Sequence, residues 1–225
     1  MANFRVQIEN LAGKSTFNTA TEESDYTTML DNFLLQSARN VIDVLDESYT
    51  SKSAIIAEVA DGDGNDCKNK KVIKVLRNNV GCVEVPLEMK SKVATASTSI
   101  YAPSSASPVY YIEGQSADDG GAKLFIKPNP SAQEKGQIYY LGIPGSISNT
   151  ASDITNFPDE AEYSVILGSS VRLIQHKLNK LLHEDEDVEL AQVVQGEMQL
   201  LNQMYMVELS QLNGDGLQVQ QQEGE

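Results

Sequence analysis

The spacing of apolar residues changes twice along the chain, and this change constrains the fold more than any other feature. Between residues 24 and 45, apolar side chains recur every three or four positions, which is the period of an amphipathic helix. Residues 54–143 instead carry short runs rich in Val and Ile, separated by turn-forming residues, which is typical of strands. From Pro158 to Leu212 the helical period returns. This order predicts an α+β protein: a helical bundle with a large antiparallel β insertion.

The helical segments are expected to share one hydrophobic core. The first helix should begin near Ser24 or Asp25, whose side chains can cap backbone N–H groups. The last third should form two long helices that pack as an antiparallel hairpin, with the first helix burying its stripe against them. The apolar face of this hairpin is the candidate packing or oligomer interface, with residues Val171, Ile174, Leu178, Leu181, Leu201 and Tyr205.

The middle segment is expected to form antiparallel meanders, because short strands follow one another across turn-length gaps. Strands are predicted at 54–60, 72–77, 80–86, 109–113, 122–127 and 137–143. The turn between the second and third of these is Asn78-Asn79, residues that tolerate a left-handed backbone.

Four regions follow from these predictions. Residues 1–50 hold an N-terminal arm and the first helix, 51–145 the β module, 146–213 a linker and the hairpin, and 214–225 a polar flexible tail.

The charge balance excludes several kinds of partner. The chain of 225 residues has 17 Lys and Arg against 32 Asp and Glu, a formal net charge of −15. Binding to nucleic acid or to an anionic membrane surface requires clustered cations, so neither is expected.

The sequence also has no apolar run approaching 18 residues and no evident secretory signal, so a soluble protein used without export is expected.

Three short motifs resemble ligand sites but lack the required pattern. Gly13-Lys14-Ser15-Thr16, with a possible strand at 4–8 before it, lacks the first glycine of a phosphate-binding loop. The acidic turn at 61–66 departs from the calcium-loop pattern and is expected to be a solvated hairpin tip, although weak calcium binding there stays open. His176 and His183 lie seven residues apart on one predicted helix, too far for joint ligation of a metal.

The inventory of reactive side chains predicts no catalytic site, no cofactor and no metal. There is no Gly-x-Ser-x-Gly motif, and two histidines and two cysteines leave few possible nucleophile and base pairs. Cys67 and Cys82 are expected to be buried thiols, although a disulfide between adjacent strands stays possible. The sequence therefore favours a structural or binding protein over an enzyme.

Several stretches together resemble the head-to-tail adaptor, or connector, proteins of tailed bacteriophages. The segment 29–42, Met-Leu-Asp-Asn-Phe-Leu-Leu-Gln-Ser-Ala-Arg-Asn-Val-Ile, is similar to their first helix. Further similarity lies at 85–89, 108–113 and 123–128 in the β module. The most specific segment is 154–163, Ile-Thr-Asn-Phe-Pro-Asp-Glu-Ala-Glu-Tyr, continuing through 178–181 and an acidic break at 184–187.

The resemblance implies a structural virion protein in a ring, typically of twelve copies, between the portal protein and the tail or nozzle proteins. Its helices would pack side by side around the axis, and its tail segment would insert between portal subunits. It would act in the tail neck after assembly in the host cytoplasm, and DNA would pass through it during genome ejection. The large β insertion departs from small adaptors, which are mainly helical, and leaves open whether this part docks the tail or anchors fibres.

The acidity of the last third agrees with a ring around DNA. Residues 158–225 hold 13 acidic and 3 basic side chains, which is two-thirds of the net charge. A wall of like charge would let DNA pass without adhesion. The candidate channel-lining residues are Glu184, Asp185, Glu186, Asp187 and Glu189.

A second interpretation is a β-domain adhesion or ligand-binding module on a helical stalk. It predicts a monomer or trimer with a concave ligand site within residues 54–143.

Overall fold

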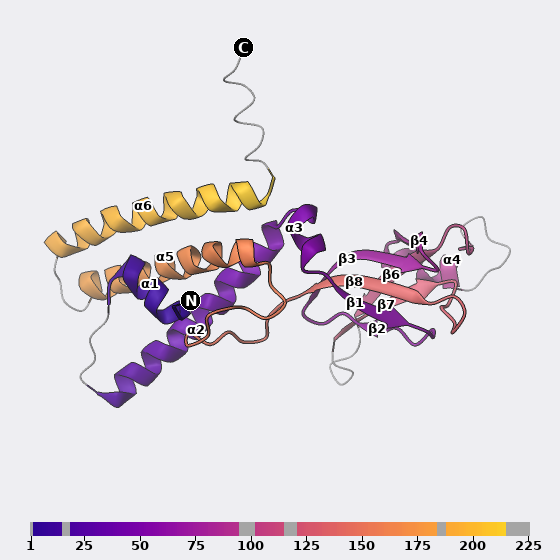
Figure 1. Ribbon diagram of the computed structural model, residues 1–225, viewed down its shortest axis with the longest axis horizontal. Helices are drawn as coiled ribbons and strands as arrows, with labels where there is room; N and C mark the ends of the chain where they lie inside the picture. Colours follow the sequence, from indigo (N-terminus) through magenta and orange to yellow (C-terminus); the bar gives the residue numbers. More distant parts are fainter. Residues whose placement is uncertain (1, 15–18, 95–101, 115–120, 184–187, 215–225) are drawn as a thin grey trace, which may run out of the picture. The chain divides into compact units, whose positions relative to one another are not determined.

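The computed structural model describes residues 2–14, 19–94, 102–114, 121–183 and 188–214, and Figure 1 draws the chain. The chain divides into two units: a helical unit of residues 1–52 and 143–225, and a β unit of residues 53–142. The helical unit holds a long C-terminal helical pair, and the β unit holds two sheets that are largely antiparallel. The predicted α+β class is confirmed.

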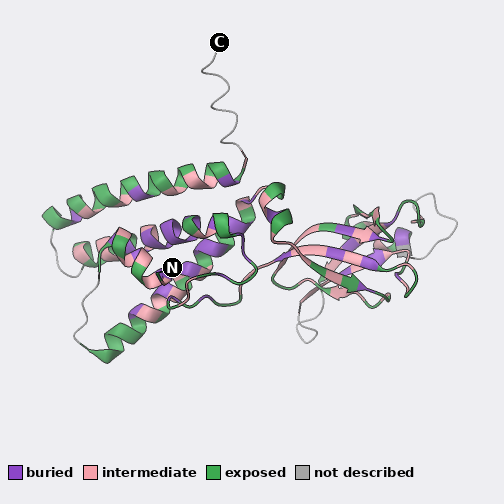
Figure 2. Ribbon diagram, in the orientation of Figure 1, coloured by how far each residue is buried: buried purple, intermediate pink, exposed green. Residues whose placement is uncertain are grey.

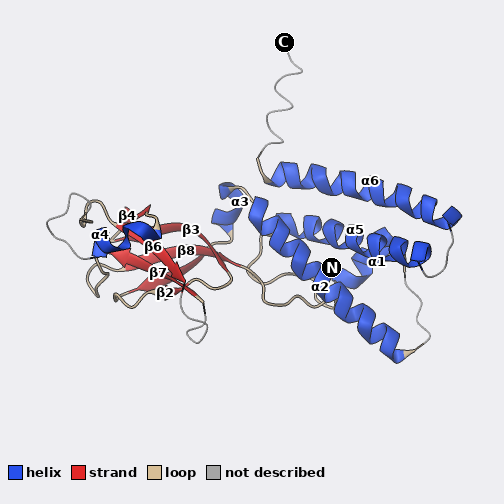
Figure 3. Ribbon diagram, turned by 180° about the vertical axis from the view of Figure 1, so that it is seen from behind, coloured by secondary structure: helices blue, strands red, loops and turns tan. Residues whose placement is uncertain are grey.

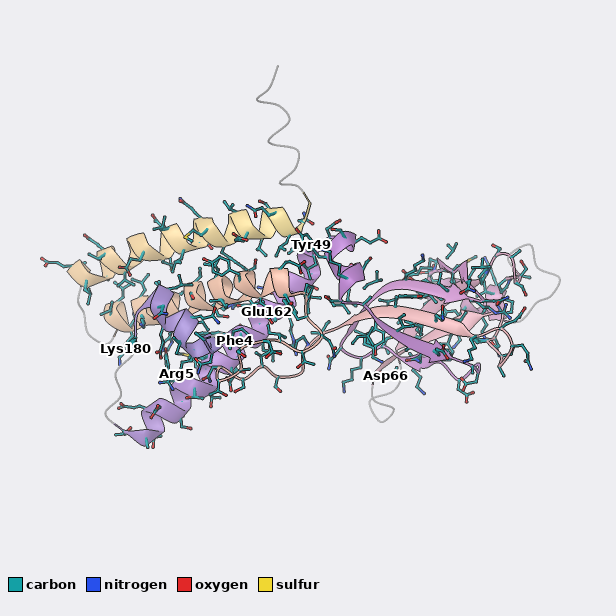
Figure 4. The ribbon with its side chains drawn as sticks, viewed as in Figure 1. Phe4, Arg5, Tyr49, Asp66, Glu162 and Lys180 are labelled. Atoms are coloured by element: carbon teal, nitrogen blue, oxygen red, sulfur yellow. The ribbon has the colours of Figure 1, made fainter. Side chains whose placement is uncertain are left out.

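The first helix of the structure lies in the segment that was interpreted as a possible strand. Helix α1 spans Phe4–Ala12, so the strand predicted at 4–8 is wrong. Phe4, Ile8 and Ala12 are buried, and their spacing of four residues is helical. The five residues 4–8 alternate like a strand, and only the continuation to Ala12 reveals the helical period. Figure 4 shows Phe4 and Arg5 at the start of this helix.

The predicted first long helix is present but begins earlier than expected. Helix α2 spans Ala20–Val44 and buries Leu30, Leu34, Ala38 and Val41. Its N-cap is Thr19, whose hydroxyl accepts a hydrogen bond from the Glu22 N–H at 3.2 Å, so the predicted caps at Ser24 and Asp25 are wrong. Apolar periodicity starts only at Tyr26, and for that reason it places the start one turn too late.

The C-terminal hairpin is formed by two helices of 25 residues each. Helix α5 spans Asp159–His183, and α6 spans Val188–Leu212; the two pack against each other. Helix α5 also packs against α1 and α2, as predicted for the first long helix (Figure 3). The Glu162 carboxylate accepts a hydrogen bond from the Ile154 N–H at 2.6 Å, which fixes the start of α5.

The segment that was expected to be a linker is held firmly to the helices. Asn149 is fully buried, and its side-chain amide and backbone N–H both donate to the Asp31 carboxylate at 2.7 Å. The Phe4 N–H donates to the Ala151 carbonyl, and the Arg5 N–H donates to the Asn149 carbonyl. This segment therefore joins α1 to α2 within the helical core.

The β unit contains two four-stranded sheets. The first has the order β1-β8-β3-β4, with strands Ile55–Val59, Gly136–Gly142, Lys70–Arg77 and Val80–Gly81. The second has the order β2-β7-β6-β5, with strands Asn65–Asp66, Ala122–Lys127, Val109–Gly114 and Val83–Glu84. The described residues also form three short helical segments: α3 (Glu47–Lys52) in the helical unit, and η1 (Leu87–Met89) and α4 (Lys90–Ala94) in the β unit.

Five of the six predicted strands are present, whereas the run predicted as one strand at 80–86 forms two short strands, β4 and β5, in different sheets. The pairing of the strands is not a simple meander. Strand β1 pairs with β8, some eighty residues later, and β5 pairs with β6 in parallel. The turn expected at 61–66 contains the short strand β2, which pairs with β7. Asn78 and Asn79 have φ of 48° and 64° and form the β3–β4 turn, as predicted.

The core between the two sheets is small and apolar. It consists of Val59, Val75, Leu124, Ile126 and Ile138. Cys67 and Cys82 pack against this cluster as free, half-buried thiols. Burial raises the pKa of the Cys82 thiol to about 11.

One buried cation holds the loop after β7 and the turn before β8. Arg77 is 3% exposed and pairs with the Glu134 carboxylate. Its Nε donates to the Pro128 carbonyl at 2.9 Å, and its other nitrogens donate to the Asn129 carbonyl and the Ser105 hydroxyl. Without the guanidinium, these four acceptors lose a charged donor.

We therefore predict that Arg77→Met lowers the free energy of unfolding by about 2 kcal/mol, the scale of losing hydrogen bonds from a charged donor. Lys74→Met, on an exposed position of the same strand, should stay within about 0.5 kcal/mol of the original chain. Urea denaturation followed by tyrosine fluorescence measures both. Equal small effects for the two variants would contradict the role given to Arg77.

Candidate assembly surface on the helical unit

The predicted hairpin residues lie at or near the packed side of α5 and α6. Ile174 and Leu201 are buried, and Val171, Leu178, Leu181 and Tyr205 are half-buried. Burial also raises the pKa of the Tyr205 hydroxyl. None of the six belongs to the large apolar side chains that the described chain leaves exposed. These six side chains therefore pack mainly within the chain.

A glycine sets the close approach of three helices. A Cβ atom added at Gly168 on α5 would lie 3.1 Å from both the Ser37 hydroxyl of α2 and the Tyr205 ring of α6. Ser169 and Ser170 are also buried, and each hydroxyl donates to a carbonyl one turn earlier on α5. Small residues thus let α2, α5 and α6 approach one another at this level.

We predict opposite effects for one substitution at two helical glycines. Gly168→Leu should destabilise the chain by about 2 kcal/mol, because the added side chain overpacks the junction. Gly196→Leu on α6 should stabilise it by up to about 1 kcal/mol through helix propensity, since a Cβ there meets nothing within 4 Å. Thermal unfolding of both variants measures the difference. A Gly168→Leu chain as stable as Gly196→Leu would show that the junction is not tightly packed.

Helix α6 carries a second apolar face that the sequence reasoning missed. Five side chains on it are between 39% and 61% exposed: Leu190, Val193, Leu200, Met204 and Val207. We call these five residues the α6 stripe. Figure 2 shows that exposed residues predominate along α6, whereas much of α5 is buried.

The faces of α6 are distinct around its axis. At 100° per residue, the α6 stripe lies roughly 110° from the buried side of Ala191, Leu201 and Leu212. Leu190 shares the apolar spacing of Val194, Leu201 and Leu212, but it is exposed. The remaining side carries mostly amides: Gln192, Gln195, Gln199, Asn202 and Gln203, all exposed.

The net charge of the protein resides entirely in the helical unit. The β unit holds ten basic and ten acidic side chains, so the helical unit carries the whole −15. Of the candidate channel-lining residues, Glu189 is exposed in the first turn of α6. Glu184, Asp185, Glu186 and Asp187 lie outside the described residues. Lys180, near the end of α5 (Figure 4), is one of seven basic residues in the helical unit.

The motif at Gly13 has a structural role. Gly13 has φ of 76° and ends α1. Lys177 of α5 donates from Nζ to the carbonyls of Ala12 and Gly13, at 2.8 and 2.6 Å. A cation at this end of a helix offsets the dipole and satisfies carbonyls that have no helical partner. Burial lowers the pKa of this ammonium group.

The other motifs contribute no ligand site in the part of the chain that the structure describes. In the acidic turn, Asp61 and Asp66 accept backbone hydrogen bonds from Asp63 and Lys68. His176 and His183 are both exposed on α5. Among the described residues, no group of three or more His, Cys, Asp or Glu side chains could hold a metal ion.

No family model matches the chain, and no curated protein matches it. None of the helices within the described ranges is long and apolar enough to cross a membrane.

Proposed function

We propose that this chain is a structural virion protein, a head-to-tail adaptor that assembles as a ring between portal and tail. No catalytic step, cofactor or metal belongs to the proposal. Its partners are further copies of itself, the portal protein, and tail or nozzle proteins. It acts in the tail neck of the virion and is present in the host cytoplasm during assembly.

The exposed α6 stripe is the observation that carries this proposal. Soluble monomers rarely expose a continuous apolar patch above a few hundred Å² unless it binds something. The stripe runs from Leu190 to Val207 along α6, and its five apolar side chains are exposed in the described chain. A protein that functions alone gains nothing from this exposure, whereas a protein that functions by assembly requires it.

The charge distribution supports the passage of DNA. A helical unit of net charge −15 repels the phosphate backbone, and it contains too few cations to bind it. Repeated around a ring of about twelve copies, as the resemblance implies, this unit would give a wall that does not adhere to DNA. The neutral β unit then suits contact with the tail or with fibres.

Ring formation is tested with the purified full chain, alone and mixed with the portal protein of the same virus. We expect ring particles in negative stain and a mass many times 24.6 kDa once portal is present. A chain that stays monomeric with portal present at micromolar concentration would contradict the proposal.

Assembly should also depend on ionic strength in a defined direction. Packing acidic units side by side costs electrostatic energy, and salt screens it. We therefore expect more ring at about 0.3 M than at about 0.03 M salt, because the Debye length falls from roughly 18 Å to 6 Å. Mass photometry across this series measures the assembled fraction. A fraction that falls as salt rises would indicate attraction between unlike charges instead.

A second candidate function, a ligand-binding module, has one observation in its favour. A polar pocket of about 270 Å³ lies at the β3–β4 turn of the β unit, lined by Asn78, Asn79, Ala132, Gln133, Lys135 and Gln137. Amide side chains both donate and accept hydrogen bonds, so they suit the hydroxyl groups of a saccharide. This candidate predicts a monomer or trimer that binds saccharides through this pocket, which a glycan array would measure. Gln133→Ala should weaken that binding.

A further inference from the structure

The α6 stripe has the spacing of a helix-pairing surface. Leu190, Val193, Leu200, Met204 and Val207 follow the alternating steps of three and four residues, and Glu197 occupies the one remaining position of the series. Side chains with this spacing interdigitate with those of a second helix along a shared seam. Helix α6 already contacts α5 through a different side. It therefore presents a second helix-pairing surface, beside the side that packs on the other described helices of its own chain.

A reversed copy of the α6 stripe matches the original. When two such helices run antiparallel and are centred between Met198 and Gln199, Leu190 of one lies level with Val207 of the other. In the same register Val193 meets Met204, and Glu197 meets Leu200. All five apolar residues then find apolar partners or the aliphatic stem of Glu197. A parallel pair would instead place Glu197 against Glu197, two like charges within one seam.

The chemistry around the stripe also suits a second copy. Helix α6 has no Lys or Arg, so it offers no ion pair to an acidic partner, and its three glutamates are widely spaced. The neighbouring side carries amides, which both donate and accept hydrogen bonds. A surface of this kind is complementary to itself, as a two-fold interface requires.

The size of the stripe indicates a reversible contact. Its five side chains expose on the order of 400 Å², and a stable interface buries about 800 Å² on each partner. Because the charged Glu197 lies near the centre of the stripe, we expect the pair to have a dissociation constant in the micromolar range.

We infer that two copies of this chain pair through antiparallel α6 stripes, forming a two-fold dimer that precedes the ring. A two-fold contact uses the same patch on both copies and closes on itself, whereas a cyclic ring joins two different patches. The dimer therefore covers the stripe and restrains ring formation until the portal is present. The restraint rests on the proposed function; the dimer itself does not.

Sedimentation equilibrium of the full chain, over about 0.1 to 100 μM, tests the dimer with a matched pair of variants. Leu200→Asp places a charge in the stripe, and Gln199→Asp places the same charge on the neighbouring amide side. Both positions are exposed, so both variants should fold, and circular dichroism checks this. We expect Leu200→Asp to raise the dissociation constant at least tenfold, and Gln199→Asp to change it less than about threefold. A wild-type chain that stays monomeric throughout, or equal effects of the two variants, would overturn the inference.

The direction of pairing is tested by cysteine cross-linking. A mixture of the Val193→Cys and Met204→Cys chains should form a disulfide heterodimer under mild oxidation. The Val193→Cys chain alone should not, because its two cysteines would lie far apart in an antiparallel pair. Cross-linking of Val193→Cys with itself would show a parallel pair and overturn the register.

Glu197→Leu separates the dimer from the ring. Removing the central charge should tighten the dimer at least tenfold and slow ring formation with portal. If the dimer becomes tighter and ring formation is unchanged, the dimer does not restrain ring formation. A dimer that forms while no ring appears under any condition contradicts the proposed function and leaves the dimer standing.

Discussion

The burial of α5 among α1, α2 and α6 is the interaction on which the helical unit depends. Residues 164–170 of α5 are buried without interruption, so this helix has no solvent-facing side over about two turns. Close approach requires small side chains, which Gly168 and the serines around it provide. The loss of α5 packing would expose the apolar stripe of α2 and one side of α6 together.

The central position of α5 explains why α6 has unused apolar surface. The described α6 rests mainly on one helix, so one side of it is covered while the α6 stripe is open. The helical unit also carries the entire net charge, which opposes indiscriminate association of these open faces. In the proposed assembly, apolar attraction along one stripe and acidic repulsion elsewhere would together restrict the chain to a few geometries. These two features connect the packing of the bundle to the proposed ring.

The apolar period along the sequence predicted the helices and strands whose formation depends on neighbouring residues. It identified α2, both helices of the hairpin and the longer strands of the β unit, because each has a single dominant apolar period. It could not predict that β1 pairs with β8, since strand pairing depends on contacts distant in sequence. It also missed the α6 stripe, because one apolar side was assumed for each helix. The signal was present in Val193, Leu200 and Val207, which recur every seven residues away from the buried side.

The central claim is that assembly covers one defined side of α6, and two methionines two residues apart test it within a single molecule. Met204 belongs to the α6 stripe, and Met206 lies roughly 200° around the helix on the amide side. They are 39% and 58% exposed, so both should oxidise to the sulfoxide in dilute, unassembled protein. Peroxide footprinting read by mass spectrometry should show Met204 protected on assembly while Met206 continues to react. Equal reactivity of the two in the assembled protein, or protection of Met206 alone, would contradict the account.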